Sequence, residues 1–181
     1  MIFWHLTDKF ITIIFMKEKI DRFLACKKIA VAGVSRNKHK FGNTIFRELK
    51  KKNFDIVPVS PNMDSFEGEK CYRSVKDLPS DVEALVIVTK PEVSLSILKE
   101  AVDKGIKNIF LQQGAQNKEI IEYAEINGVN LICKHCILMF ADPTGIHKFH
   151  ERITKFFGFY PNWQITDQDM LNQLIQLPVI I

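Results

Sequence analysis

Residues 29–43 read IAVAGVSRNKHKFGN, and this stretch decides the fold. Its first part, residues 29–34, is a short run of small and branched apolar residues, typical of a strand buried on both faces of a sheet. A polar loop follows, and Gly42-Asn43 opens a segment whose apolar residues recur at helical spacing. The stretch therefore predicts a strand, a glycine-containing loop and a helix, the first half of a βαβ unit.

The same alternation of strand and helix continues along the chain. Two of the later helical patterns stop at a glycine, Gly105 and Gly128, the residue favoured just after a helix end. Five apolar strands alternating with helices predict an α/β fold with right-handed crossovers. We expect a single domain with a doubly wound, parallel, five-stranded sheet, Rossmann-like, with the strand order 3-2-1-4-5. The expected strands are residues 29–34, 55–59, 84–88, 108–111 and 129–133.

We divide the chain into three parts. Residues 16–157 form the expected Rossmann-like domain, which a helix near residues 144–157 closes. Residues 1–15 are apolar and aromatic but lack the basic leading region and the cleavage site of a signal peptide, so we treat them as an appendage of unassigned role. Residues 158–181 are a tail with a short amphipathic helix, which docks on its own domain or serves as a dimer contact.

Composition excludes several classes of protein. The chain has 181 residues, 46% of them hydrophobic and 25% charged, as in ordinary globular proteins. No apolar run reaches the length of about 18 residues that a membrane-spanning helix needs. A net charge of +4 is too small to indicate a bulk nucleic-acid binder. Four cysteines without an export signal favour reduced thiols and a cytoplasmic protein.

The loop after the first strand has the features of a phosphate site. In doubly wound sheets, ligands bind beyond the carboxyl ends of the strands where the strand order reverses, here expected between the loops after strands 1 and 4. Gly33 allows a sharp turn, and the helix start at Gly42 presents unpaired amides. Seven Lys or Arg and one acid lie between residues 36 and 52. The alternative is a tight turn beside solvated lysines.

The loop does not fit a nicotinamide dinucleotide. Its glycines, at positions 33 and 42, do not match the pattern G-x-G-x-x-G, and the second strand ends in Val59-Ser-Pro-Asn62 without the acid that holds a free ribose diol. The first carboxylate after that strand is Asp64. Coenzyme A suits the sequence better, because its ribose carries a 3′-phosphate.

Five motifs in residues 23–140 carry a resemblance to a known family. They are IAVAGVSRNKHKFGN, IVPVSPN, FEGEKCYRSVKDLP, ALVIVTKPE and FLQQGAQN. Together they resemble the coenzyme A-binding domain family, whose fold also forms the amino-terminal part of the α subunit of succinate–CoA ligase. Ser60 stands where that family usually has asparagine.

The resemblance implies that coenzyme A lies across the carboxyl edge of the sheet. The first loop and helix start would take the phosphates, the end of the second strand would line the adenosine, and the loops after the third and fourth strands would line the rest. The expected cofactor-binding residues are Gly33, Val34, Ser35, Arg36, Lys40, Phe41, Gly42, Asn43, Val59, Ser60, Pro61, Thr89, Lys90, Pro91, Gln113 and Gly114.

The resemblance implies a coenzyme A or acyl-CoA binding protein, with a binding or regulatory role and no defined catalysis. The larger ligases of the family use a phosphorylated histidine in a separate domain, for which we find no counterpart. An NAD(P)-dependent oxidoreductase, or a CoA-transferring enzyme working with a partner subunit, is the alternative; its candidate acid–base residues are Lys90, His135 and Cys136. A nucleotide sensor that signals through its tail is the third. A homo-oligomer or a partner subunit is compatible with each.

Two further patterns favour ordinary structural roles. Cys133, Cys136, His147 and His150 have the spacing C-x2-C-x10-H-x2-H, but zinc fingers usually place their histidines three to five residues apart. As a nucleophile, Cys136 would need a cation or a helix start nearby to lower the pKa of its thiol. Lys134 and His135 are close in sequence, but adjacent residues of a strand point to opposite faces. We therefore expect no metal site and no catalytic residue in this segment.

Overall fold

A five-stranded parallel sheet forms the centre of the protein. The structure is a computed structural model, and it describes residues 15–141. Its strands are β1 (Lys28–Ala32), β2 (Asp55–Val59), β5 (Ala84–Ile87), β6 (Asn108–Leu111) and β7 (Asn130–Ile132). Their order across the sheet is β2-β1-β5-β6-β7, and every pair of neighbours is parallel. The α/β class is confirmed, and each expected strand is present with ends within two residues of the prediction.

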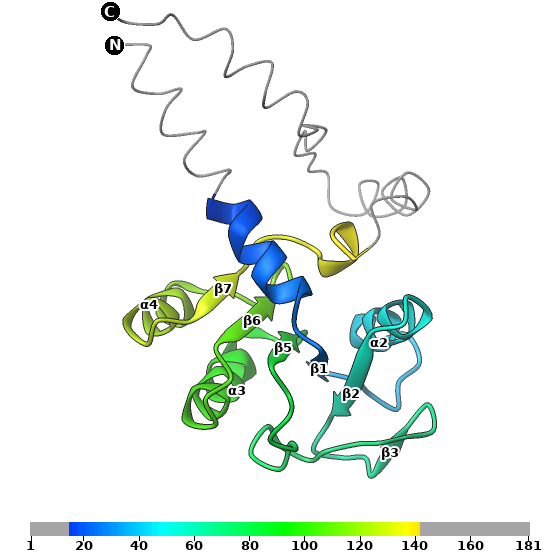
Figure 1. Ribbon diagram of the computed structural model, residues 1–181. Helices are drawn as coiled ribbons and strands as arrows, with labels where there is room; N and C mark the ends of the chain where they lie inside the picture. The colour runs from blue at the N-terminus through cyan, green and yellow to red at the C-terminus, as the bar shows by residue number, and fades with distance from the viewer. Residues whose placement is uncertain (1–14, 142–181) are drawn as a thin grey trace, which may run out of the picture. The chain divides into compact units, whose positions relative to one another are not determined.

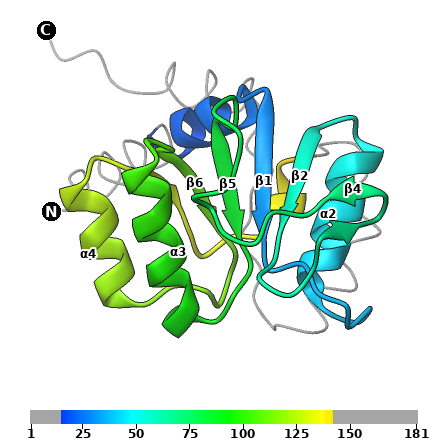
Figure 2. The same cartoon turned by 90° about the horizontal axis from the view of Figure 1, so that it is seen from below.

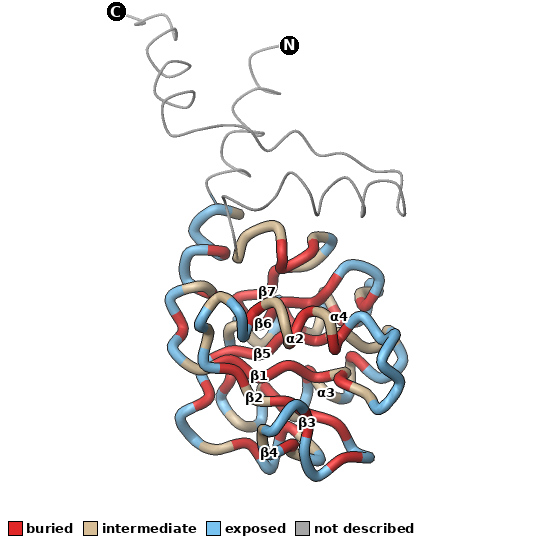
Figure 3. Tube along the Cα trace, turned by 90° about the vertical axis from the view of Figure 1, so that its right-hand side faces the viewer, coloured by how far each residue is buried: buried red, intermediate tan, exposed pale blue. Residues whose placement is uncertain are grey.

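Helices cover both faces of this sheet. Figures 1 and 2 show α3 (Pro91–Asp103) and α4 (Lys118–Ile126) on one face. The helical residues 15–24 and α2 (Phe41–Lys51) lie on the other face. Both faces are covered, and the strands are apolar except for polar first residues such as Lys28 and Asp55. Figure 3 shows the strands as the most continuously buried part of the chain.

Local sequence explains where the helices begin and end. Pro91 occupies the first turn of α3, where its missing N–H has no intrahelical partner to lose. Asn117 caps α4, since its side-chain oxygen accepts a hydrogen bond from the Ile120 amide at 2.9 Å. Gly105 and Gly128, with φ of 82° and 62°, follow the ends of α3 and α4 as predicted.

The core consists of two apolar layers that the sheet separates. On one face, Leu98 of α3 and Ile120 of α4 are fully buried against the strands. On the other, Phe23 packs edge-on against Phe110 of β6, with ring centroids 5.7 Å apart, and Phe46 of α2 is fully buried. Burying side chains of this size contributes about 1.5–3 kcal/mol each.

The position of one strand differs from the prediction. We expected residues 84–88 on the outer side of β2, but β5 pairs directly with β1. The place beside β2 is taken by Tyr72, which forms a one-residue parallel bridge with Val59. Counting this bridge as the third strand, the sheet has the Rossmann-type order, with β5 in the fourth position. The strand order therefore reverses between β1 and β5, and the loops after these two strands flank that point.

The connection between β2 and β5 contains a hairpin that the sequence did not predict. Its strands are β3 (Ser65–Phe66) and β4 (Glu69–Lys70), which pair antiparallel. The hairpin is tied to α2 by two ion pairs, Arg47–Glu67 at 2.7 Å and Lys50–Glu69 at 2.6 Å. The cations of α2 thus face carboxylates of the hairpin instead of open solvent.

Some predictions fall outside the described residues. These are the appendage up to residue 14, the closing helix at 144–157 and the tail at 158–181. Among residues 15–141, the structure contains no helix of the length and hydropathy needed to cross a membrane.

Candidate nucleotide-binding site

Gly33 forms the turn at the end of β1, and only glycine fits there. Its φ is +115°, and a Cβ at this position would lie 2.8 Å from the carbonyl oxygen of Val88. Its amide donates to the carbonyl of Val59 at 3.2 Å. The ends of β1, β2 and β5 therefore converge on this residue.

Gly42 brings the start of α2 against that turn. A Cβ on Gly42 would overlap the carbonyl group of Gly33, so the helix approaches more closely than any other residue would allow. Phe41 and Gly42 are the first residues of α2, where amides have no intrahelical acceptor. The contact places the positive end of the helix directly beside the loop after β1.

Asn43 holds the loop in one conformation. Its side chain is almost fully buried, and its oxygen accepts a hydrogen bond from the Ser35 amide at 2.8 Å. Its nitrogen donates to the carbonyls of Ser35 and Asn37 at 2.9 and 3.0 Å. All three bonds join the helix start to the loop, so Asn43 fixes the loop against α2.

These contacts divide the loop amides into two sets. The amides of Gly33, Ser35, Asn37, His39, Lys40 and Asn43 donate to groups of the protein. Within residues 15–141 no acceptor is found for the amides of Val34, Arg36, Lys38, Phe41 and Gly42. The expected cradle of amides is therefore partly occupied by the protein, and the second set remains for an anion.

The basic residues also divide into two sets. Along α2, Arg47, Lys50 and Lys51 form ion pairs with carboxylates of the hairpin or of the helix itself. In the loop, Arg36, Lys38 and Lys40 are exposed and form no ion pair with any described residue. The unbalanced positive charge thus lies at the helix start, beside the unoccupied amides.

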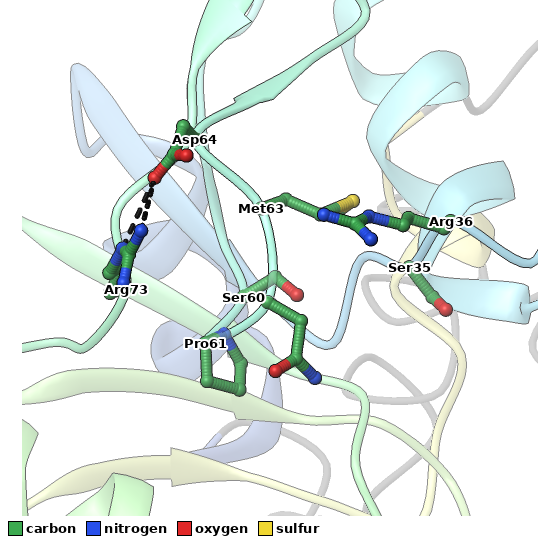
Figure 4. A pocket seen from close by; sticks show the side chains of 8 residues that line it. Ser35, Arg36, Ser60, Pro61, Met63, Asp64 and Arg73 are labelled. Carbon is green, nitrogen blue, oxygen red and sulfur yellow. Dashed lines mark hydrogen bonds and ion pairs between the residues drawn. The ribbon is translucent and has the colours of Figure 1, made fainter.

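A pocket opens between this loop and the end of β2. It has a volume of about 600 Å³ and is shown in Figure 4. Its lining residues are Ser35, Arg36, Ser60, Pro61, Asn62, Met63, Asp64 and Arg73. The sequence predicted the first four as site residues and missed the last four. The Tyr72 bridge explains the omission of Arg73, because it brings a residue from a long connection next to the end of β2.

One wall of the pocket carries an ion pair. Both Nε and Nη2 of Arg73 donate to the same oxygen of Asp64, Oδ1, at 3.1 and 2.9 Å (Figure 4). The two side chains are 69% and 81% exposed. Asp64, the first acid after β2, is therefore in the pocket, but Arg73 engages its carboxylate.

Ser60 and Val59 lie at the end of β2 as expected. Ser60 is buried, and its amide donates to the carbonyl of Tyr72 at 2.8 Å. Its side chain contributes to the pocket lining together with exposed Pro61. Ser60 is thus part of the pocket wall.

The loop after β5 lies on the other side of the point where the strand order reverses. The hydroxyls of Thr89 and Ser94 form a hydrogen bond of 2.8 Å. Ser94 is fully buried, and its hydroxyl also lies within hydrogen-bond distance of the carbonyl oxygens of Thr89 and Lys90, at 3.2 and 3.0 Å. Pro91 starts α3. This loop is fixed by its own helix, and it does not line the pocket.

Gln113 and Gly114 follow β6, one strand farther from β1 than β5 is. Both are exposed; the Gln113 amide donates to the carbonyl of His135 at 3.1 Å, and the Gly114 amide donates to Gln116. The structure therefore does not bring them to the pocket formed by the first two loops.

Burial shifts the pKa of the cysteines and of the histidine after β7. Burial raises the pKa of the Cys136 thiol, which is 2% exposed, and burial is also the main cause that raises the pKa of Cys133. Burial, followed by Lys134, lowers the pKa of His135. Within residues 15–141 no group of His, Cys, Asp or Glu could hold a metal ion. His147 and His150 of the zinc pattern lie outside this range, so that interpretation stays untested.

The residues of this site fall within a region that matches a known family. Residues 27–142 match the CoA binding domain family. The chain belongs to this family. Among the expectations drawn from the sequence, the family assignment is thus confirmed, together with the Rossmann-like α/β fold.

Curated relatives include parts of larger ligases. The chain is 29% identical over 129 residues to the α subunit of acetate–CoA ligase (ADP-forming) II of Pyrococcus furiosus, and 32% identical over 134 residues to acetate–CoA ligase (ADP-forming) of Methanocaldococcus jannaschii. The matches cover 65% and 73% of this chain, but 28% and 19% of those proteins. The chain therefore spans less than a third of the length of these ligases.

Solved structures include proteins that the fold matches over nearly their whole length. A conserved hypothetical protein of Pyrococcus furiosus is 45% identical, with a TM-score of 0.61, and the match covers 62% of this chain and 97% of that one. A hypothetical protein of Pyrococcus horikoshii is 26% identical, with a TM-score of 0.64 and coverage of 76% and 90%.

Proposed function

We propose that this protein binds coenzyme A or an acyl-CoA, with the diphosphate at the loop after β1 and the start of α2. The proposal is carried by a set of amides beside three cations that form no ion pair with any described residue. These amides find no acceptor within residues 15–141 and belong to Val34, Arg36, Lys38, Phe41 and Gly42. Amides and positive charge at a helix start are the elements of an anion site. The family match supports a coenzyme A ligand over other phosphorylated ones.

The contacts that hold the loop support ligand binding to a preformed site. The Asn43 hydrogen bonds and the contact between Gly42 and Gly33 are made within the protein and hold the loop in place. A site that is already ordered loses little conformational entropy on binding. We propose that the other expected residues contact the ligand more peripherally: Val59, Ser60 and Pro61 on the adenosine side, and Thr89, Lys90, Pro91, Gln113 and Gly114 farther along the sheet edge.

We propose a binding or regulatory role in the cytoplasm, without catalysis by the domain itself. Cys136 gives no support to a reaction through a thiolate, since the thiol is buried and burial raises its pKa. All four cysteines are free thiols, which fits a reducing compartment.

A second candidate function is the coenzyme A-binding part of a larger ligase assembly. The α subunit of the Pyrococcus furiosus acetate–CoA ligase, with which this chain shares 29% identity, is itself one subunit of an enzyme. In that case a partner would supply the groups that activate the acyl substrate. Co-purification of a partner protein that confers CoA-dependent acyl transfer would favour this candidate.

Ligand-induced stabilisation tests the main proposal. A ligand at a hundredfold excess over its dissociation constant stabilises a protein by about 2.7 kcal/mol. For a protein of this size we expect coenzyme A to raise the melting temperature by about 5–10 °C. NAD⁺ and ATP at the same concentration should raise it by less than coenzyme A does. A rise with NAD⁺ or ATP, and none with coenzyme A, would overturn the proposal.

A further inference from the structure

The segment after β7 places an exposed lysine at the carboxyl edge of the sheet. Lys134 follows Ile132, the last residue of β7, by two positions. The carbonyl oxygen of the next residue, His135, accepts a hydrogen bond at 3.1 Å from the amide of Gln113, which belongs to the loop after β6. Lys134 therefore lies near the carboxyl ends of β6 and β7, on the same edge of the parallel sheet as the loop after β1.

The backbone of Lys134 has a conformation that lysine rarely adopts. Its φ is +67°, in the left-handed region that favours glycine and asparagine. Residues in such conformations cluster at functional sites, where the surrounding structure fixes them. Here the chain that follows is fixed by a second hydrogen bond, in which the Ile137 amide donates to the side-chain oxygen of Gln112 at 3.3 Å. The protein thus keeps a lysine at a position where glycine would form the same turn without strain.

The spacing of the strands relates Lys134 to the length of a pantetheine arm. Neighbouring strands lie about 4.8 Å apart, so β7, three strand spacings from β1, is roughly 14 Å away from it. The pantetheine arm has about twelve bonds from the diphosphate to the sulfur, as many as four extended residues, and so it also spans roughly 14 Å. With the diphosphate at the loop after β1 and the adenosine toward β2, an arm that runs over β5 and β6 brings its thioester to the loop after β7.

Two other exposed lysines are not at this distance. Lys90 follows β5, which is the direct neighbour of β1 and lies about 5 Å from it, so the arm passes this loop well before its sulfur. Lys107 directly precedes β6 and therefore lies at the amino edge of the sheet, opposite the loop after β1. Lys107 reports how fast an exposed lysine reacts with a thioester from solution.

We propose that Lys134 is acylated by the thioester of an acyl-CoA bound to the same protein molecule. This proposal rests on the proposed function, because the arm must start from a diphosphate at the loop after β1. Nζ, as the neutral amine, attacks the carbonyl carbon of the thioester; a C–N bond forms, the C–S bond breaks, and the amine proton goes to the departing coenzyme A thiolate. The acyl group stays on the chain, so the reaction is a single modification and not a catalytic turnover, and Lys134 loses its positive charge.

The rate of acetylation at increasing acetyl-CoA concentration tests the proposal. A thioester held beside its target acts at an effective concentration of about millimolar. At micromolar acetyl-CoA we therefore expect Lys134 to be acetylated about tenfold faster than Lys107 or more, as measured by peptide mass spectrometry of the full chain. The rate at Lys134 should saturate at the concentrations that saturate binding, whereas the rate at Lys107 should rise linearly.

A truncated thioester and a pair of variants are the controls. S-acetylpantetheine carries the same thioester without the nucleotide, so it should acetylate Lys134 and Lys107 at similar rates. Lys134→Arg keeps the charge, should lose the fast acetylation, and should bind coenzyme A within about twofold of wild type. The matched variant Lys107→Arg should retain the fast acetylation. Excess coenzyme A should suppress acetylation at Lys134 and leave the rate at Lys107 unchanged.

The outcomes separate the two proposals. If coenzyme A binds but Lys134 is acetylated no faster than Lys107, or its rate does not saturate, the acylation site is wrong while the proposed function stands. Acetylation concentrated at Lys90, or on Cys133 as a thioester that hydroxylamine removes, would likewise overturn the assignment to Lys134. If neither coenzyme A nor acetyl-CoA binds in titration calorimetry, the proposed function itself fails, and this inference fails with it.

Discussion

The contact between Gly33 and Gly42 determines how closely the start of α2 approaches the turn after β1. Gly33 needs its positive φ and has the carbonyl of Val88 against its Cα, whereas Gly42 has an ordinary helical conformation and is restricted by space alone. The two requirements differ physically. The sequence indicated the first, a turn, but the second depends on a contact across the βα connection that spacing does not reveal.

Gly42→Ala should destabilise the protein. In an unrestricted helix, replacing glycine by alanine is favourable by about 1 kcal/mol. Here the new methyl group would overlap the carbonyl of Gly33, and relief of that overlap must move α2 away from the loop. We expect a net loss of about 1–3 kcal/mol in the free energy of unfolding, measured by urea denaturation, together with weaker coenzyme A binding.

Gly68→Ala is the control for this variant. Gly68 has a φ of +82°, and nothing lies within 4 Å of a Cβ placed there. It therefore tests the effect of backbone strain without a steric overlap, far from the loop amides. A Gly42→Ala protein as stable as wild type, or one that binds coenzyme A equally well, would contradict the tight contact.

At the scale of elements, the loop of residues 33–40 depends on a side chain from the helix that follows it. Asn43 of α2 accepts one hydrogen bond from the loop and donates two. Asn43→Asp keeps the shape but removes both donors and places a carboxylate beside two carbonyl oxygens and the phosphate site. We expect a loss of about 1–3 kcal/mol in unfolding free energy and weaker coenzyme A binding by calorimetry.

The matched control is Asn117→Asp. Asn117 caps α4 by accepting a single hydrogen bond, and aspartate caps a helix equally well. The same chemical change should therefore leave stability within about 0.5 kcal/mol of wild type. Equal effects of the two substitutions would mean that the Asn43 bonds do not order the loop.

Elements that depend on local sequence were predictable, and those that depend on distant pairing were not. The strands were evident from apolar runs, and the α4 cap and the glycine stops were evident from single residues. The place of β5 was missed because Tyr72, which occupies the edge beside β2, belongs to no periodic pattern. Arg73 was missed for the same reason, since its position in the pocket follows from that bridge.

At the scale of the whole molecule, the basic residues fall into two groups, one along α2 and one in the loop after β1. The cations of α2 are paired with carboxylates, whereas Lys38 and its neighbours in the loop form no ion pair with a residue that the structure describes. A field concentrated at one opening attracts a multiply charged anion and weakens as salt increases. The modest net charge of +4 conceals this concentration.

Lys38→Gln should weaken coenzyme A binding chiefly through slower association. An exposed charge near a helix start contributes about 0.3–1 kcal/mol to anion binding, which corresponds to about a twofold to fivefold change. Stopped-flow measurements at several salt concentrations should show a smaller association rate and a shallower salt dependence than in wild type.

Lys51→Gln removes a charge that is paired with Glu48, and it serves as the control. Its association rate should follow that of wild type at each salt concentration. Should both variants lower the rate equally, the attraction would come from the net charge of the molecule and not from the loop.

The edge of the sheet beside β2 has a consequence for association between chains. Pro58 has no N–H to donate, its carbonyl accepts from the Tyr72 amide at 2.9 Å, and the Ser60 amide donates to Tyr72 in return. An incoming strand from another molecule would find these backbone groups already satisfied at the carboxyl half of β2. The Tyr72 bridge should therefore hinder edge-to-edge pairing between chains on the side where the pocket opens.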